Sequence, residues 1–189
     1  MPPKAKFTKE EIVECALQLV RREGYSALTA RGLGKALGTS SRPIFTAYPS
    51  MVQLQYDVMV TAYQLYHNFI AQETASGRYP PYKATGMAYI RFALEEKALF
   101  ELLFMRQRSQ EEIQQDICDP LVIERILQAN DFTYEQAEYL YLQMWIYVHG
   151  IATLLVTSYF TLDFEQISNM MTDIYHSLRE QIKAKGATS

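Results

Sequence analysis

Hydrophobic residues recur at every third or fourth position along most of the chain, and this spacing predicts amphipathic helices. Ser, Thr or Asp precedes several of these periodic segments, often with Glu or Gln three residues later, which is the pattern of a capping box. No stretch alternates apolar and polar residues as a strand does, so we expect an all-α fold. The expected helices cover about residues 9–23, 51–76, 82–96, 98–107, 120–130, 134–160 and 164–184.

Residues 28–48 differ from the rest, because they predict two short helices joined by a tight turn. Thr29 can cap the first helix with its side-chain oxygen. Gly38 can adopt the positive φ that ends this helix and redirects the chain. Thr39 or Ser40 can then cap the second helix. The segment therefore predicts a helix-turn-helix, whose second helix can enter the major groove of DNA, ~12 Å wide.

Two glycines lie inside the first short helix, where each costs roughly 1 kcal/mol relative to alanine. Gly34 has a packing reason, because a small residue lets the two helices approach closely. The side chains expected to face inward there are Leu33, Leu37 and Ile44. Gly32 has no comparable reason in the sequence. We therefore expect this helix pair to be soft in the absence of DNA.

The composition indicates a folded protein of one large or two small domains. The chain has 189 residues, 49% of them hydrophobic and 13% aromatic, which supports a sizeable core. Its basic start lacks an apolar stretch, and residues 144–160 are too short and too polar for a membrane span, which needs ~20 apolar residues. Cys15 and Cys118 form no CxxC pair. We therefore expect a reduced, cytoplasmic setting.

Charge is distributed unevenly along the chain. The net charge is −3, which alone argues against a nucleic-acid binder. Residues 1–48, however, hold eight Lys or Arg and four Glu, whereas the remainder has a net charge of −7. This asymmetry favours a phosphate-binding segment on an acidic body. Lys4 and Lys6 could add to the phosphate contacts, although a solubilising tail is the alternative.

Catalytic and metal-binding motifs are absent from the sequence, which contains no GxGxxG, P-loop, HExxH or Cys/His cluster. No glutamate stands three residues before His67, His149 or His176, so the Glu-x-x-His motif of di-iron bundles is missing as well. The sequence thus predicts a protein that is not an enzyme and has no cofactor and no metal site. Double-stranded DNA is the expected partner.

Two apolar stripes near the end of the chain, within residues 134–160 and 164–184, approach a heptad repeat. Such a stripe most often forms the core of its own chain. Two such helices beside a DNA-binding segment also fit a four-helix bundle with a second copy. The residues assigned to this expected dimer interface are Ala152, Leu155, Tyr159, Ile167, Met170, Met171, Ile174 and Leu178.

Aromatic residues and methionines are frequent on the middle helices, where they could line a pocket for an apolar or planar small molecule. Arg91 among them could hold an anionic ligand, or it could be a solvated surface arginine. Ordinary helical core is the alternative for each of the others. The residues assigned to this expected ligand site are Tyr63, Tyr66, Tyr89, Arg91, Phe92, Phe104, Met105, Tyr141, Trp145 and His149.

The helix-turn-helix segment resembles the TetR family of transcriptional regulators. The resemblance is carried by Gly24, the pair Leu28-Thr29, the turn Gly38-Thr39-Ser40 and the aromatic-ended helix from Phe45 to Tyr48. Looser similarities follow at Leu99-Phe100 to Phe104 and at Trp145-x-x-x-His149-Gly150.

The resemblance implies a homodimer that binds a palindromic operator, usually as a repressor. A small molecule bound in the helical body would change the spacing of the DNA-binding segments and release the DNA. It also implies a division into a DNA-binding domain at residues 1–50 and a regulatory domain for ligand binding and dimerisation at residues 51–189.

Thr29 and Arg31 match family positions that contact phosphate. Arg42 is the first candidate for base reading, because its forked donors match O6 and N7 of guanine; phosphate contact is an equal alternative. Two departures weaken the expected grip on phosphate, since Phe45 replaces a common tyrosine and Met51 a common lysine. The full set of expected DNA contacts is Thr29, Arg31, Thr39, Ser40, Ser41, Arg42, Phe45, Thr46 and Tyr48.

Three other functions remain open at this point. The chain could be a helical ligand-binding or interaction protein that has lost specific DNA binding, as Phe45 and Met51 would allow. It could activate transcription with the same fold. An all-α enzyme is the third, although the sequence suggests no substrate for it.

Overall fold

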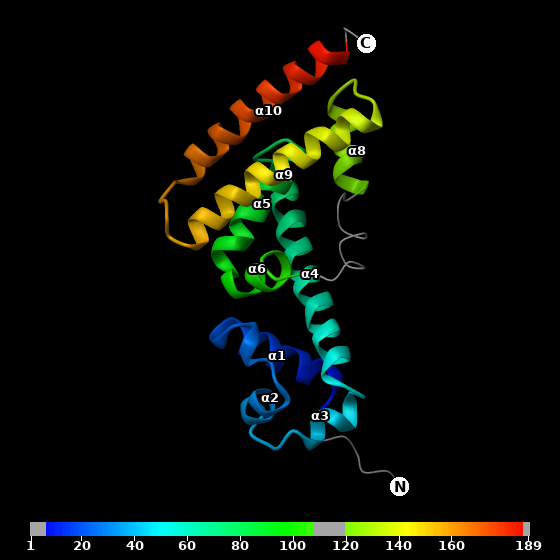
Figure 1. The fold of residues 1–189 in the computed structure, drawn as a ribbon, viewed down its shortest axis with the longest axis vertical. Coiled ribbons are helices and arrows are strands. Elements are labelled where there is room, and N and C mark those ends of the chain that lie inside the picture. Colours follow the sequence, from blue (N-terminus) through cyan, green and yellow to red (C-terminus); the bar gives the residue numbers. More distant parts are fainter. Residues whose placement is uncertain (1–6, 108–119, 187–189) are drawn as a thin grey trace. The chain divides into compact units, whose positions relative to one another are not determined.

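The computed structural model describes residues 7–107 and 120–186. Every regular element in these two ranges is helical, which confirms the all-α fold (Figure 1). The elements are α1 (Lys9–Glu23), η1 (Tyr25–Ala27), α2 (Ala30–Ala36), α3 (Arg42–Ala47), α4 (Met51–Ala75), α5 (Pro81–Glu95), α6 (Lys97–Phe104), α8 (Pro120–Ala129), α9 (Tyr134–Val156) and α10 (Phe164–Gly186).

Some expectations lie outside the described residues. These are the contributions of Lys4 and Lys6 and the free thiol at Cys118. Cys15, on α1, is a free and partly buried thiol.

The chain forms two compact units. Unit 1 comprises Met1–Asn68 and Glu96–Arg106, and unit 2 comprises Phe69–Glu95 and Gln107–Ser189. The boundaries thus fall within α4 and between α5 and α6. The functional division expected after residue 50 remains a prediction, because packing does not test it.

Capping boxes begin three of the helices, as the sequence predicts. The Thr8 hydroxyl accepts a 3.1 Å hydrogen bond from the backbone N–H of Glu11, whose carboxylate accepts one from the Thr8 N–H. Thr133 makes the same reciprocal pair at the start of α9, and Asp163 does so at the start of α10. These local bonds satisfy N–H groups that the first helical turn leaves without partners.

The core of unit 1 is built where α1 meets α2 and α6. Fully buried aliphatic side chains from α1, α2 and α3 supply it. At the α1–α6 contact, Arg21 donates hydrogen bonds of 2.8 and 2.7 Å to the two carboxylate oxygens of Glu96. This paired geometry fixes α1 against the start of α6, because a guanidinium and a carboxylate match in two places at once.

Unit 2 is organised around α9, which packs against α5, α8 and α10. A methyl group on Gly86 of α5 would collide with the end of the Met171 side chain of α10, so glycine permits this close approach. The buried residues that form one core cluster of α8, α9 and α10 are Ile123, Ile126, Ala137, Leu140, Met144 and Ile182.

By length and composition α9 could cross a membrane, since it has 23 residues and an apolar window of mean hydropathy 1.3. The helix begins at Tyr134, so it is longer than the apolar stretch at residues 144–160 that the sequence predicted to be too short for a span. One third of the apolar window is buried inside unit 2. A core helix of a soluble protein passes the same test, so this composition by itself is weak evidence for a membrane.

Candidate nucleic-acid interface

The turn between α2 and α3 has the geometry that its sequence predicts. The Thr29 hydroxyl caps α2 by accepting a 3.0 Å hydrogen bond from the N–H of Gly32. Gly38 has a φ of +66° and redirects the chain after α2. A methyl group on Gly34 would lie 3.0 Å from backbone atoms of Ser40 and Ser41. Glycine there permits the close approach of α2 to the start of α3 without displacing the backbone of Ser40 and Ser41.

Gly32 also has a packing reason, which the sequence did not reveal. A methyl group at this position would overlap the backbone carbonyl oxygen of Ala27 in η1. The expectation that Gly32 only softens the helix pair is therefore wrong. The contact was invisible in the sequence because it depends on how the short helix η1 folds back beside α2.

The start of α3 lies one residue later than the predicted caps. Ser41 occupies the N-cap position without a side-chain hydrogen bond, and Pro43 lies in the first turn. The Ser40 hydroxyl instead accepts a 3.4 Å hydrogen bond from the N–H of Arg42. Farther along α3, the Thr46 hydroxyl donates to the Arg42 carbonyl oxygen at 3.2 Å. Both hydroxyls are thus engaged by the backbone of Arg42.

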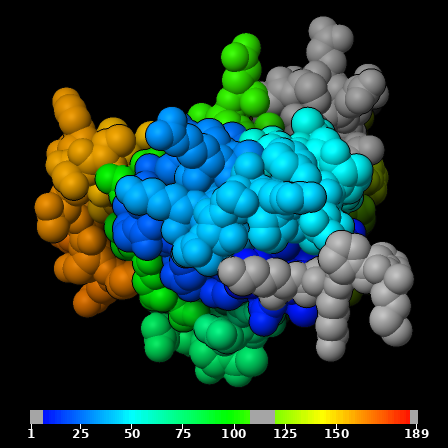
Figure 2. Space-filling view, turned by 90° about the horizontal axis from the view of Figure 1, so that it is seen from below, coloured from blue at the N-terminus to red at the C-terminus, as the bar shows by residue number. Residues whose placement is uncertain are grey.

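The helix-turn-helix segment lies on the face of unit 1 seen in light blue and cyan in Figure 2. Arg31, Lys35 and Arg42 are all exposed. Lys35 was absent from the expected contacts, although its place one turn after Arg31 on a short helix could have indicated it. We call the shallow hollow at this turn the turn hollow; its lining residues are Arg31, Lys35, Gly38, Thr39, Ser40 and Ser41.

Tyr48 belongs to the core of unit 1 and not to this face. Its exposed fraction is 1%, and its hydroxyl donates a 3.0 Å hydrogen bond to Asp57 of α4. Burial and this bond raise the pKa of Tyr48. The Nζ atom of Lys9 lies 4.8 Å from the centre of its ring. The prediction that Tyr48 contacts DNA is therefore wrong, because a buried side chain cannot reach a phosphate.

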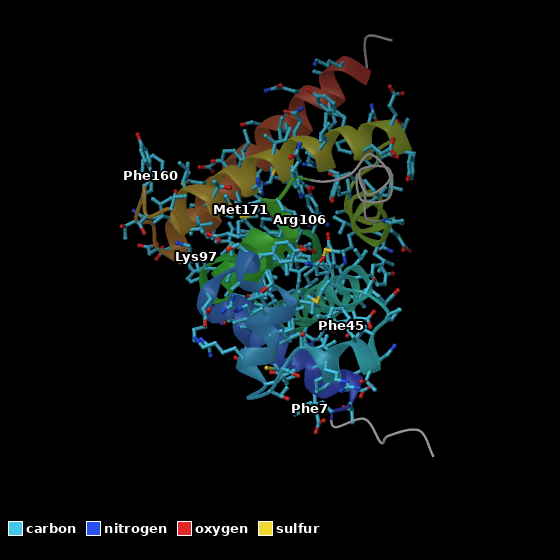
Figure 3. The ribbon with its side chains drawn as sticks, turned by 60° about the horizontal axis from the view of Figure 1, so that its bottom comes forward. Phe7, Phe45, Lys97, Arg106, Phe160 and Met171 are labelled. Atoms are coloured by element: carbon cyan, nitrogen blue, oxygen red, sulfur yellow. The ribbon has the colours of Figure 1, made fainter. Side chains whose placement is uncertain are left out.

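Phe45 does lie on the surface of α3, with 49% of its area exposed (Figure 3). Met51, the second departure from the family pattern, is the first residue of α4 and is partly buried. The Ser50 hydroxyl before it accepts a 3.3 Å hydrogen bond from the N–H of Gln53. The side-chain amide of Gln53 donates to Asp57 instead of bonding back to Ser50, so only half of a capping box forms here.

The expected ligand-site residues are divided between the two units. Those in unit 1 lie on α4 and around α6, where the rings of Tyr63 and Tyr66 pack edge-on against Phe104 at centroid distances of 6.1 and 5.3 Å. Met105 follows α6 and is 42% exposed. The members in unit 2 are Tyr89, Arg91, Phe92, Tyr141, Trp145 and His149.

An aromatic cluster joins α5 to α9 inside unit 2. The Tyr89 hydroxyl and His149 Nδ1 share a 2.8 Å hydrogen bond. The indole of Trp145 stacks on the His149 ring with a centroid distance of 4.9 Å and an interplanar angle of 4°. Burial lowers the pKa of His149. Phe92 is fully buried and packs edge-on against Phe69, and Tyr141 is partly buried against the core cluster.

Arg91 is neither a solvated surface arginine nor an open anion site. Its guanidinium donates a 2.8 Å hydrogen bond to the Glu73 carboxylate, whose side chain is 5% exposed. It also donates to the Gln72 side chain at 3.0 Å, lies 3.5 Å from the Glu95 carboxylate, and covers the Phe69 ring. Its charge is therefore matched within unit 2, which argues against the expected role of holding an anionic ligand.

Most residues assigned to a dimer interface face the core of unit 2. Ala152, Leu155, Ile167 and Met171 are buried in the single chain. Met170 is partly buried, and Ile174 and Leu178 pack against the core cluster. The four buried residues therefore belong to the core of their own chain, whereas the interface role of Met170, Ile174 and Leu178 stays a prediction. Tyr159 differs, since it is 75% exposed.

A different apolar surface of unit 2 is exposed, and we call it the α9 outer face. Leu142, Trp145 and Ile146 are 43, 38 and 55% exposed on successive turns of α9. Tyr159 and Phe160 follow the end of this helix, and Figure 3 shows Phe160 on that segment. The sequence could have indicated this face, because the apolar residues of α9 extend around the helix beyond a single core-facing stripe.

Comparison with protein-family models relates part of the chain to a known family. Residues 82–177, slightly more than half of the chain, match the model of the tetracyclin repressor-like C-terminal domain. No curated protein matches the chain. The matched residues include the contact of α5 with α9 that organises unit 2.

Proposed function

The chain belongs to the TetR family of transcriptional regulators, and from this premise we propose that it is a ligand-responsive repressor that binds a palindromic operator as a homodimer. The turn hollow carries the proposal. Arg31 and Lys35 are exposed beside it, and Thr39, Ser40 and Ser41 complete it. Cations and hydroxyls around a helix-turn-helix are the groups that bind phosphate on either side of a major groove.

In the proposed complex α3 enters the major groove and Arg42 reads guanine. The Arg42 side chain is exposed on the first turn of α3, where recognition helices present base-reading residues. The phosphates are contacted by Arg31, Lys35 and Thr29, and these contacts orient α3. The cytoplasm is the compartment in which such a regulator would meet DNA.

We propose the α9 outer face as the surface that pairs two copies. Exposed apolar side chains on consecutive turns would leave water when the same face of a second copy covers them. Binding of a palindromic operator requires the two α3 helices of such a pair to reach half-sites one helical turn apart, ~34–36 Å. The variant Ile146→Glu should convert dimers to monomers in sedimentation, whereas Glu138→Gln on the same helix should not. Monomeric wild-type protein would contradict this surface.

The effector is proposed to be a planar or apolar small molecule that contacts the aromatic cluster of Tyr89, Trp145 and His149. Tyr63, Tyr66, Phe104, Met105, Tyr141 and Phe92 remain secondary candidates. No cofactor or metal is invoked. Isothermal titration of wild-type protein and Tyr89→Ala with candidate effectors would test the assignment, since Tyr89 lies outside the α9 outer face and equal affinities would remove it from the site.

A gel shift with DNA from upstream of the protein's own gene, at several stated salt concentrations, tests operator binding. We expect a clear preference over random DNA of equal length and release on addition of the effector. Equal binding to both DNAs would overturn the proposal and favour a helical ligand-binding or interaction protein. A promoter-reporter assay then separates repression from activation, since deletion of the regulator should raise expression from a repressed promoter.

A further inference from the structure

We propose that Phe45 recognises the 5-methyl group of a thymine in each operator half-site. The inference rests on the proposed operator binding and extends it to the sequence that is bound. It starts from an exposed aromatic ring on a helix that otherwise presents polar groups. Phe45 keeps 49% of its area exposed, although the neighbouring Ile44 is fully buried in the core.

The side chains around Phe45 leave few other groups for base reading. The Ser40 hydroxyl accepts a hydrogen bond from the Arg42 N–H, and the Thr46 hydroxyl donates to the Arg42 carbonyl. Tyr48, the other aromatic residue at this end of α3, is buried. The exposed side chains on α3 are therefore the guanidinium of Arg42, the phenyl ring of Phe45 and the hydroxyl of Thr46, which is already engaged.

A phenyl ring has no donor or acceptor in its plane, so it cannot read the hydrogen-bonding edges of bases. The major groove offers one apolar feature, the methyl group on C5 of thymine, and phenylalanine is among the side chains suited to it. Phe45 lies three residues after Arg42 and therefore on the same face of α3. A ring in this position enters the groove together with Arg42.

Phe45 lacks the hydroxyl that a tyrosine would offer to a phosphate, and this lack has a second consequence. A tyrosine at residue 45 could bond to a phosphate and turn away from the bases. Phenylalanine gains nothing from a phosphate, and its free energy falls only when its apolar area leaves water. The substitution therefore favours base contact over backbone contact at this residue.

The test begins with selection of bound duplexes from a random pool by the full-length protein. Each thymine of the selected half-site is then replaced in turn by deoxyuridine, which removes only the methyl group. We expect one replacement per half-site to weaken wild-type binding by about fourfold, the effect of one buried methyl group. The variant Phe45→Ala should bind more weakly overall and should not distinguish thymine from deoxyuridine at that position.

Two controls keep the result interpretable. Phe45→Leu keeps an apolar side chain without a hydroxyl and should retain the response to deoxyuridine, and circular dichroism should show that both variants keep the wild-type helix content. A duplex in which 5-methylcytosine–guanine replaces the critical thymine–adenine pair should bind better than one in which cytosine–guanine replaces it. The reason is that 5-methylcytosine carries its methyl group at the same place as thymine.

The outcomes separate the two proposals. Failure of the selection to enrich any sequence would remove the proposed operator binding itself. An enriched operator at which no deoxyuridine replacement weakens wild-type binding would overturn the role of Phe45 alone. The role of Phe45 would also be overturned if replacing the critical thymine by deoxyuridine weakened the binding of Phe45→Ala and of the wild type by the same factor.

Discussion

The Tyr48 hydroxyl donates a 3.0 Å hydrogen bond to Asp57, and this bond joins the residue that ends α3 to the second turn of α4. Tyr48 is buried, and this bond satisfies its one side-chain polar atom inside the core. The orientation of the proposed recognition helix is therefore set by a core contact inside unit 1.

Removal of this bond should weaken unit 1 without removing a DNA contact. Tyr48→Phe keeps the ring and leaves Asp57 with its bond from Gln53, so we expect a loss of about 1 kcal/mol in the free energy of unfolding. Chemical denaturation measures this loss. The affinity for DNA at a fixed salt concentration should stay at the wild-type value, and a uniform loss across different duplexes would indicate that the Tyr48 hydroxyl does reach a phosphate.

Neutralising the cations of the turn hollow should reduce the salt dependence of DNA binding. Arg31→Gln and Lys35→Gln should each lower the slope of log K against log salt by about 0.9, because each removes one phosphate contact. Fluorescence anisotropy with labelled duplexes at several salt concentrations gives the slopes. Lys97→Gln, an exposed lysine of α6, removes the same charge and should leave the slope unchanged.

Arg42→Ala distinguishes base reading from phosphate contact. If Arg42 reads guanine, discrimination at one base pair of each half-site should fall by about 1–3 kcal/mol while other positions keep theirs. Competition assays with single-base operator variants measure this pattern. A uniform loss across all variants would instead assign Arg42 to phosphate. Arg22→Ala, which removes an exposed arginine of α1, is the matched control.

Gly32→Ala should destabilise the protein, even though alanine is the better helix former. The added methyl group would overlap the Ala27 carbonyl, and overpacking of this kind costs about 1–3 kcal/mol, more than the ~1 kcal/mol gained in helix propensity. Gly150→Ala is the control, because a methyl group there meets open space and should be neutral or stabilising. Thermal unfolding of both variants compares them, and a stabilised Gly32→Ala would refute the contact.

His149 should make the protein less stable in acid. Burial lowers its pKa below the ordinary value of 6.5, so the unfolded chain binds a proton more readily than the folded one. Its contribution to stability is therefore complete above about pH 6.5 and is lost as the pH falls towards the lowered pKa of the folded state. His149→Gln should flatten this part of the stability–pH curve. A stability–pH curve that His149→Gln leaves unchanged would contradict this origin of the acid sensitivity.

Local features of the fold could be predicted from the sequence because they depend on a few neighbouring residues. The capping boxes at Thr8, Thr133 and Asp163 are bonds between residues three apart. The positive φ of Gly38 follows from the turn that its neighbours require. The helix-turn-helix and the all-α class are therefore properties of the sequence itself.

Which face of a helix meets another helix was decided only by the tertiary structure. Ile167 and Met171 were assigned to a partner copy and prove to be core, whereas Ile146 is exposed. Tyr48 was assigned to DNA and bonds to Asp57, and Gly32 has its reason in the carbonyl of Ala27, which the fold of η1 places against α2. A helical period reveals that an apolar face exists, but burial depends on packing partners that are far away in the sequence.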